Sequence, residues 1–401
     1  MVRQLFQQLY YITHVENLPS IFNHGILSHR RIVDDRVQFT PIYDASIVSN
    51  RGQKATPDGN TLWDFANLYF QPRNAMLYRV AREKSVGEIC ILTVRPDIVN
   101  QSGVIVSNGN AASHQTEFLV GKTGTKAIPG ILRKVNKKWW SDADGSKREM
   151  MAECLVPGSV PADSITTVYV GSRDGQKLAR HSVPENVTVT LEPDMFFEPT
   201  AVIELDPMLH LAEGDLFFSG MQTVTVSVNT VGVMGKGLAS TAKDRFPDVY
   251  VRYQDACRNK SLRMGKPYIV KRESSFDQDL ADQPGSFTNG AQETWFLLFA
   301  TKSHWRENAD FAGIEQGLTW LLKNYKKEGI TSVAMPALGC GLGKLTWSDV
   351  GPLMCRYLSQ MTIPTWIYLP GEKAIKAEEK TREFLLGNAP SSAPVQLSII
   401  A

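Results

Sequence analysis

The sequence has few features of a membrane, secreted or metal-binding protein. No segment approaches 18 consecutive apolar residues, and the N-terminal stretch contains no apolar run long enough for a signal peptide. The five cysteines are an odd number and are scattered without a C-x-x-C pair, so they support neither a disulfide framework nor a zinc site. We therefore expect a soluble cytoplasmic protein with reduced thiols, no metal and no membrane partner.

A strong net charge is also absent. The formal charge of +2 is too small to identify a nucleic-acid-binding protein, so local charge clusters have to be inspected instead. No internal repeat is present. With 401 residues, of which 43% are hydrophobic, the chain exceeds the size that one core usually serves, and two domains are expected.

The sequence pattern changes near residue 208. A segment rich in proline and acidic residues ends there, and regular alternation of apolar strands with amphipathic helices follows. Strands are predicted at 222–230, 294–300, 331–337 and 364–370, and helices are predicted from Gly235, Asn308 and Thr346. This order indicates helices packed on a mostly parallel or mixed sheet, in which ligands bind where strands end.

Two glycine-rich loops each follow a predicted strand and precede a predicted helix. They read "VNTVGVMGKGLA" (228–239) and "MPALGCGLGKLTW" (335–347). Such loops let backbone N–H groups approach a phosphate, although glycines also serve ordinary turns. Lys302 lies between the two loops, just past an apolar strand, where its amine either reaches into the cleft or is solvated.

The first 208 residues are predicted to form a mixed α+β domain, because helices and strands are interspersed without a regular βαβ rhythm. A helix is expected near Asn17, with Pro19 in its first turn and Gly25 at its end. The segments "MLYRV" (76–80), "EICILTV" (88–94) and "ITTVYVG" (165–171) are predicted as strands.

Glu153 is the most unusual residue of this first part. It lies among methionine, cysteine, leucine and valine, and a carboxylate in such surroundings needs a partner or a task. Three other candidates have structural alternatives. His14 could be a capping or core histidine, Arg51 could be solvated, and Arg73 could hold backbone carbonyls.

A basic stretch with two tryptophans precedes Glu153 in "ILRKVNKKWWSDADGSKRE" (131–149). Basic side chains follow a phosphate backbone and aromatic faces stack on unpaired bases, so the stretch suits single-stranded DNA. The alternative is a solvated basic loop whose tryptophans pack inward. The predicted DNA-binding residues are Arg133, Lys134, Lys137, Lys138, Trp139 and Trp140.

The motifs "GDLFFS", "VNTVGVMGKGLA", "FATKSHWR" and "MPALGCGLGKLTW" resemble the macrodomain of the DarG antitoxin family, and more distantly the human terminal ADP-ribose protein glycohydrolase. The resemblance implies an α/β/α three-layer domain that binds ADP-ribose and hydrolyses its link to a DNA base, with Lys302 as catalytic lysine. Gly343 occupies the place of an acidic residue in the human relative. The implied ADP-ribose-binding residues are Asn229, Gly232, Val233, Met234, Gly235, Lys236, Gly237, Ala337, Leu338, Gly339, Cys340, Gly341, Leu342 and Gly343.

The motifs "ITHVENLPSI", "NLYFQPRNAMLY", "NGNAASHQTEF" and "MMAECLVPGSVP" resemble the DarT family of single-stranded-DNA ADP-ribosyltransferases. This resemblance implies that NAD is the donor and that Glu153, Arg51 and His14 are catalytic. The implied NAD-binding residues are Thr13, His14, Asn17, Arg51, Arg73 and Tyr78. The chain as a whole is then similar to a fusion of a toxin with the antitoxin that reverses its modification.

The expected limits are 1–208 for the transferase domain, 209–375 for the macrodomain and 376–401 for a helix end and a mobile tail. Two other functions stay open at this point. One is an RNA-directed ADP-ribosyltransferase or 2′-phosphotransferase with a macrodomain eraser, and the other is a non-catalytic ADP-ribose reader. The oligomeric state and the modified base, thymine or guanine, also stay open.

Overall fold

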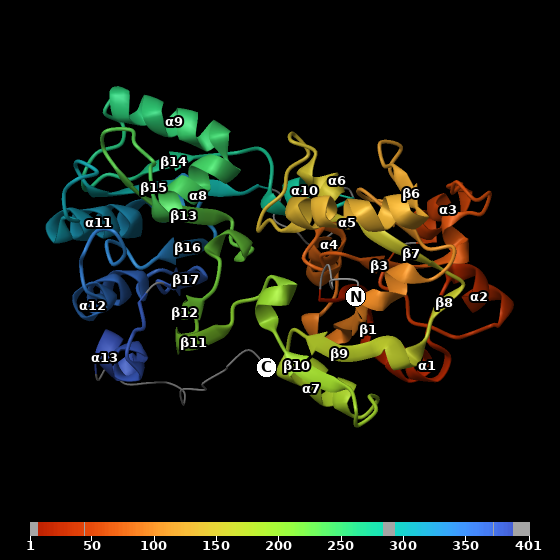
Figure 1. The fold of residues 1–401 in the computed structure, drawn as a ribbon. Coiled ribbons are helices and arrows are strands. Elements are labelled where there is room, and N and C mark those ends of the chain that lie inside the picture. The colour runs from red at the N-terminus through yellow and green to blue at the C-terminus, as the bar shows by residue number, and fades with distance from the viewer. Residues whose placement is uncertain (1–6, 44, 284–292, 372, 388–401) are drawn as a thin grey trace. The chain divides into compact units, whose positions relative to one another are not determined.

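The computed structural model describes residues 7–43, 45–283, 293–371 and 373–387. The chain forms two compact units (Figure 1). The first contains residues up to Phe197 together with the described part of a segment that begins at Asp277, and the second begins at Glu198. The predicted mobile tail from residue 388 onward lies outside the described residues.

The first unit is built on an eight-stranded sheet with the order β10-β9-β4-β1-β3-β7-β5-β6. Neighbouring strands are antiparallel except for the parallel pair of β9 and β10. The strands of this sheet are β1 (Leu9–His14), β3 (Phe65–Tyr69), β4 (Ile89–Val94), β5 (Ile105–Ser107), β6 (Phe118–Val120), β7 (Glu153–Pro157), β9 (Ile165–Val170) and β10 (Thr188–Leu191).

Short helices and a small two-stranded sheet complete this unit, so the predicted α+β class is confirmed. β2 (Ile26–Leu27) pairs with β8 (Ser159–Val160). The helices are α1 (Leu18–His24), α2 (His29–Asp34), α3 (Ala45–Gln53), α4 (Ala75–Glu83), α5 (Gly121–Val135), α6 (Ser146–Met150) and α7 (Arg173–Arg180). As predicted, α1 begins next to Asn17, contains Pro19 in its first turn and ends at Gly25, whose φ of 82° suits glycine.

The strand predicted at 76–80 is wrong, because these residues lie in helix α4. The side chain of Asn74 accepts a hydrogen bond from the N–H of Leu77 and so caps the helix. A short apolar run does not distinguish a strand from a buried helix, and the capping residue was the missed signal. The predicted strands at 88–94 and 165–171 correspond to β4 and β9.

The second unit has a seven-stranded sheet with the order β11-β12-β17-β16-β13-β15-β14. The five central strands are parallel, and β11 and β14 are antiparallel edge strands. The strands are β11 (Ala201–Asp206), β12 (Leu209–Glu213), β13 (Thr223–Asn229), β14 (Tyr268–Val270), β15 (Trp295–Lys302), β16 (Val333–Pro336) and β17 (Thr365–Tyr368). The four strands predicted for this part are confirmed.

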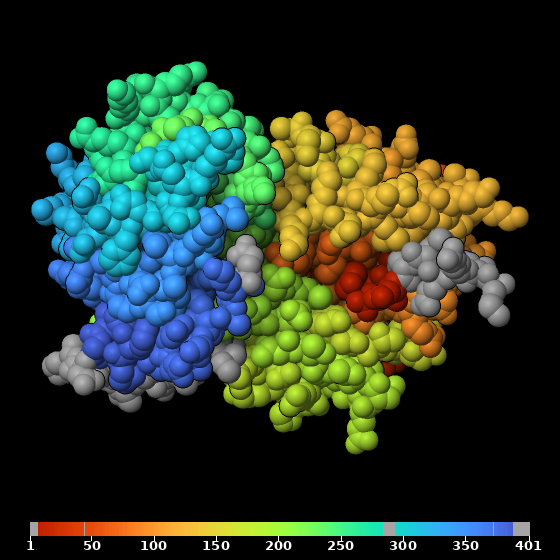
Figure 2. Space-filling model, turned by 60° about the vertical axis from the view of Figure 1, so that its left-hand side comes forward, coloured from red at the N-terminus to blue at the C-terminus, as the bar shows by residue number. Residues whose placement is uncertain are grey.

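Helices cover both faces of this sheet, which gives the predicted three-layer α/β/α arrangement (Figure 1). α8 (Gly237–Arg245) and α9 (Pro247–Arg258) lie on one side, and α11 (Phe311–Glu328), α12 (Trp347–Leu358) and α13 (Arg382–Leu386) lie on the other. β15 is an almost unbroken apolar run because both of its faces are buried. Figure 2 shows residues of this unit from about 300 onward, in cyan and blue, as a close-packed surface.

The sequence-based domain limits remain predictions, and the compact units divide at somewhat different places. The predicted limit at 208 falls in the hairpin of β11 and β12, whose residues pair across the turn. The break at Phe197 keeps this hairpin in the sheet of the second unit.

A short segment from the second half of the sequence forms part of the first unit. α10 (Phe276–Leu280) begins it, and the residues from Asp277 onward belong to this unit. Asp282 accepts a hydrogen bond from Nε of Arg79 at 2.7 Å, and its own N–H donates to the carbonyl of Ala75. Asp277 accepts from the hydroxyl of Tyr78 at 2.7 Å. The segment is therefore anchored on α4.

This anchoring is expected to stabilise the first unit. Asp282→Ala removes one partner of the fully buried Arg79 guanidinium, while the second partner, Glu83, remains. We expect the free energy of unfolding to fall by about 3 kcal/mol, the lower end of the range for breaking a buried ion pair. Hydrogen exchange in the full chain should then speed up in β1, β3 and β4. The control Asp255→Ala breaks only an exposed pair on α9, and equal exchange in the two variants would contradict the role of Asp282.

Candidate active sites

The first candidate site centres on the carboxylate of Glu153, the first residue of β7. β7 lies between β3 and β5, and Glu153 is opposite Tyr69 of β3. The side chain is 0% exposed, which explains its apolar neighbours in the sequence. Burying an isolated carboxylate is strongly unfavourable, so the charge needs partners.

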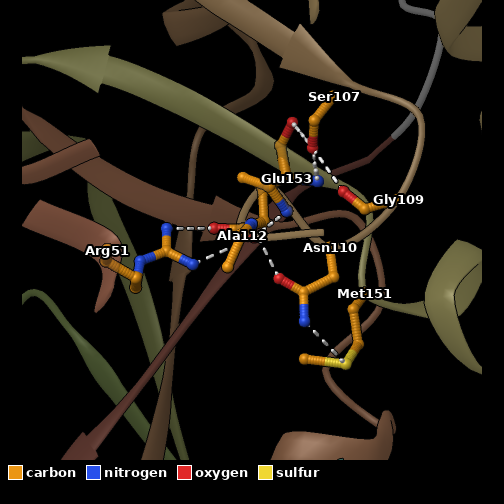
Figure 3. A network of polar contacts seen from close by, with 8 residues as sticks. Arg51, Ser107, Gly109, Asn110, Ala112, Met151 and Glu153 are labelled. Atoms are coloured by element: carbon orange, nitrogen blue, oxygen red, sulfur yellow. Dashed lines mark hydrogen bonds and ion pairs between the residues drawn. The ribbon is translucent and has the colours of Figure 1, made fainter. Parts of the chain in front are cut away.

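Two segments distant in sequence supply these partners (Figure 3). Nη2 of Arg51, on α3, donates to Oε2 of Glu153 at 2.7 Å, and Nη1 lies 3.4 Å from Oε1. The backbone N–H of Ala111, in the loop after β5, donates to Oε1 at 2.8 Å. Oε1 therefore accepts from a charged and a neutral donor, and Oε2 accepts from a charged donor.

The loop that carries this backbone donor is held by its own hydrogen bonds. The hydroxyl of Ser107 accepts from the N–H of Glu153 at 2.9 Å and donates to the carbonyl of Gly109 at 2.7 Å. The side-chain oxygen of Asn110 accepts from the N–H of Ala112 at 3.0 Å. These contacts fix the loop against the start of β7, so its amide faces the carboxylate without rearrangement.

The pKa values of neighbouring groups reflect this charge. Burial alone would lower the pKa of Arg51, but the facing Glu153 carboxylate offsets this effect, and the pKa lies above its ordinary value. Burial, and then the charge of Glu153, raise the pKa of Tyr69. The site thus holds a guanidinium cation and a neutral phenol around the carboxylate.

Three residues predicted to bind NAD lie at the end of β1 and just after it. His14 is buried, and its Nδ1 accepts a hydrogen bond from the N–H of Glu16, so the capping alternative describes its present contact. Asn17 donates to Oγ1 of Thr13 and to the carbonyl of Thr40. Thr13 and Asn17 also line a cavity of about 40 Å³.

Arg73 is engaged with a turn late in the first unit. Its Nη1 donates to the carbonyl of Asp194 at 2.6 Å and lies at the same distance from the carboxylate of this residue. The guanidinium also lies over the ring of Phe197, 4.8 Å from its centroid. The carbonyl-holding alternative therefore describes its contacts, and its role toward NAD stays a prediction.

Two of the residues predicted to contact a ligand are buried, and these contacts stay predictions. Tyr78 was predicted to bind NAD, but it is buried and its hydroxyl donates to Asp277. Trp140 was predicted to stack on DNA, but it is 2% exposed, packs edge-on against Phe197 and donates to the carbonyl of Leu280. Both side chains take part in the packing around α4 and the segment from Asp277.

The basic side chains of the same stretch remain at the surface. Arg133 and Lys134 end helix α5, Lys137 and Lys138 follow it, and all four are exposed. Lys134 pairs with Glu149 at 2.6 Å. Trp139 is half-buried. The four basic side chains are thus exposed as a DNA-binding surface requires, whereas the second tryptophan is buried.

The second candidate site lies where β13 and β15 end side by side in the other unit. Asn229, the last residue of β13, is in register with Lys302 at the end of β15. The buried Asn229 side chain accepts from the N–H groups of Val231 and Val233 and from the hydroxyl of Tyr253. It thereby shapes the first glycine-rich loop, which leads into α8.

The second glycine-rich loop connects β16 to α12 and is tightly folded. A Cβ atom at Gly343 would lie 2.4 Å from the carbonyl oxygen of Gly339, so a side chain does not fit there. This explains why an acidic residue is absent from the position, and it removes a carboxylate from the surroundings of Lys302. A Cβ at Gly341 would meet nothing within 4 Å, which leaves this part of the loop backbone open.

Lys302 contacts both its own loop and the second glycine-rich loop. Its Nζ donates to the carbonyl of Glu307 at 2.9 Å and to the carbonyl of Leu342 at 3.2 Å. Burial and the charge of Lys344 lower the pKa of the amine, and Glu307 only partly opposes them. The amine is therefore easier to deprotonate than that of a solvated lysine.

Sequence reasoning missed the backbone donor at Ala111 and the supporting hydroxyl of Ser107. The segment "NGNAASHQTEF" is one of the motifs that carry the resemblance. The donor in it is the backbone N–H of Ala111, and a backbone group cannot be recognised from the residue type. Within the described residues, no group of three or more His, Cys, Asp or Glu side chains could hold a metal ion. No helix among them is long and apolar enough to cross a bilayer.

Comparison with known proteins gives matches to each part and to the whole chain. The family model described as "ssDNA thymidine ADP-ribosyltransferase, DarT" matches residues 10–197. A DNA ADP-ribosyl glycohydrolase of Mycobacterium bovis is 34% identical over 178 residues, which is 44% of this chain and 46% of that protein.

The most extensive of these similarities is to a DNA ADP-ribosyl transferase-DNA ADP-ribosyl glycohydrolase fusion protein of Thermosipho africanus. Identity is 49% over 383 residues, covering 95% of this chain and 98% of the relative. The structure of Thermosipho africanus DarTG in complex with ADP-ribose has a TM-score of 0.86, with 48% identity, and covers 95% of this chain and all of that one. The resemblance noted in the sequence is therefore confirmed, and the chain belongs to the family of DarT–DarG fusion proteins.

Proposed function

We propose that the first unit transfers ADP-ribose from NAD to thymidine in single-stranded DNA and that the second unit hydrolyses the resulting link. As a family member the chain is a DNA ADP-ribosyltransferase joined to an ADP-ribosylglycohydrolase. Thymidine is preferred over guanine as the acceptor because the matching family model is described by that nucleoside.

The buried Glu153 carboxylate, with Arg51 at 2.7 Å and an amide donor at 2.8 Å, is the observation that carries this proposal. When nicotinamide leaves NAD with the bonding electrons, positive charge develops on the ribose, and a preorganised carboxylate stabilises it. The ring nitrogen of thymine then bonds to the anomeric carbon. Its proton passes to Glu153, which acts as the general base.

Arg51 and the residues after β1 would hold the donor. A guanidinium presents paired N–H groups that match a diphosphate, so Arg51 can turn from Glu153 to the diphosphate of NAD when the donor binds. His14, Thr13 and Asn17 would contact the ribose hydroxyls. The exposed Arg133, Lys134, Lys137 and Lys138 would follow the phosphates of the DNA strand.

In the second unit the two glycine-rich loops would bind the phosphates and distal ribose of ADP-ribose, with residues 229–237 and 337–343 as the site. Lys302 would attack the anomeric carbon or open the ribose as an imine, and water would finally supply the hydroxyl to the sugar and the proton to the base. Because Gly343 has no room for a side chain, the amine acts without a carboxylate at that position of the second glycine-rich loop.

Two alternatives from the sequence make different predictions. An RNA-directed enzyme would label an RNA oligonucleotide of the same sequence better than its DNA counterpart when both are incubated with labelled NAD. A non-catalytic reader would label neither and would bind free ADP-ribose without releasing it from modified DNA. Transfer to single-stranded DNA, followed by release, supports the proposal against both.

Glu153→Gln should abolish transfer. The amide keeps the size of the side chain but cannot accept the proton or stabilise the ribose cation, so we expect the rate to fall by about 10²-fold to 10⁴-fold. The measurement is label transferred from NAD to a thymidine-containing single strand. Glu185→Gln, at an exposed position of the same unit, is the matched control. A parental rate in the Glu153 variant would refute the proposed base.

Lys302→Ala should leave ADP-ribosylated DNA to accumulate, because the chain would add the modification without removing it. In the parental protein the release of ADP-ribose should increase with pH, since the neutral amine is the reactive form. The midpoint of this rise should lie below 10.5, the ordinary lysine value, because burial disfavours the charged amine. A pH–rate profile on modified oligonucleotide tests this, and a flat profile would argue against a lysine nucleophile.

A further inference from the structure

The loop between β15 and α11, called the connecting loop below, is hydrogen-bonded to both glycine-rich loops of the second unit. Lys302 precedes this loop. At its start the carbonyl of Ser303 accepts hydrogen bonds from the N–H and the hydroxyl of Thr230, which belongs to the first glycine-rich loop. At its end the N–H of Ala309 donates to the carbonyl of Gly343, in the second loop. The loop is therefore fixed between both parts of the ADP-ribose site.

The middle of this connecting loop presents three neighbouring planar side chains, those of His304, Trp305 and Arg306. Trp305 is 47% exposed. The imidazole of His304 lies 5.3 Å from its ring centroid at an interplanar angle of 30°, and the guanidinium of Arg306 lies 4.5 Å from that centroid. Aromatic rings and guanidinium planes are the groups on which proteins stack unpaired bases.

Other exposed apolar side chains come from the two glycine-rich loops themselves. Val231 and Val233 belong to the first loop and Leu342 to the second, and all three are exposed. Leu342 lies close to Gly237, and its carbonyl also accepts from Lys302. Apolar side chains gathered around loops that suit phosphates indicate a ligand with both an anionic and an apolar part.

We propose that His304, Trp305 and Arg306 form the nucleobase subsite of the glycohydrolase. The thymine that carries ADP-ribose stacks on this platform, while the ADP-ribose lies in the glycine-rich loops and Lys302 faces the bond between them. This inference rests on the proposed hydrolysis. It identifies a binding place for the nucleobase, which is present in modified DNA and absent from free ADP-ribose.

The position of the modified base is limited by the short distance along the chain between Lys302 and Trp305. Two residues separate Lys302 from Trp305 on a loop that is hydrogen-bonded at both ends, so a group beyond the scissile bond has the platform within reach. Stacking of one base contributes roughly 1 to 3 kcal/mol, which corresponds to an effect on affinity of about 5-fold to 150-fold. The cationic plane of Arg306 also suits the neighbouring phosphates of the strand.

The test compares Trp305→Ala and Trp305→Phe in full-length protein that also carries Glu153→Gln, so that no new modification forms. The substrate is a single-stranded oligonucleotide modified beforehand with the Lys302→Ala variant. We expect Trp305→Ala to lower kcat/KM for release of ADP-ribose about tenfold or more, and Trp305→Phe to restore most of it. Affinity for free ADP-ribose should be unchanged in both.

The control is Val251→Ala, which truncates an exposed apolar residue on α9 and should change neither quantity. An unchanged kcat/KM in Trp305→Ala would overturn the subsite. Parallel loss of affinity for free ADP-ribose would also overturn it, because the tryptophan would then merely support the loop.

Failure of the proposed hydrolysis would be recognised separately, since the parental chain would then release no ADP-ribose. In that case the subsite is tested by binding alone. The Lys302→Ala variant should bind the modified oligonucleotide more tightly than the double variant that carries both Lys302→Ala and Trp305→Ala. Equal affinities would refute the subsite.

Discussion

The first unit depends on the charge of one buried carboxylate. Glu153 lies inside a sheet where water does not reach it, and its charge is balanced by a guanidinium from α3 and an amide from the loop after β5. Because a buried charge without such partners would destabilise the fold, the positions of these two segments are constrained together. The group that would perform transfer is thus also the group that organises the surrounding structure, and Arg51 serves both purposes.

In the second unit, backbone N–H groups rather than charged side chains would supply the positive potential at the site. Parallel strands end at one edge of the sheet, and there the Asn229 side chain, the glycine-rich loops and Lys302 lie close together. Anion binding at such an edge needs few charged side chains, because amides and helix N-termini supply the positive potential. The pKa of the Lys302 amine at this edge is lowered by burial and by the charge of Lys344.

Much of the second unit could be predicted from its sequence because the signals are local. The apolar runs of β13 and β15 and the glycine loops that follow strands are readable within ten residues. In the first unit, Glu153 is identifiable from its unusual neighbours, but its pairing with Arg51 spans about a hundred positions and was not predicted. Trp140 shows the limit, since an aromatic residue beside lysines has the same local pattern whether it faces solvent or packs against Phe197.

The residues from Asp277 to Asp282 have a consequence for how the gene can change. They are encoded within the stretch for the glycohydrolase half, yet they complete the packing of α4 in the transferase half. A stop codon or frameshift before these residues removes most of the glycohydrolase unit and also the segment that packs on α4 of the transferase unit. A truncated chain that lacks the glycohydrolase would therefore also lack these contacts, and we expect its transferase unit to be less stable.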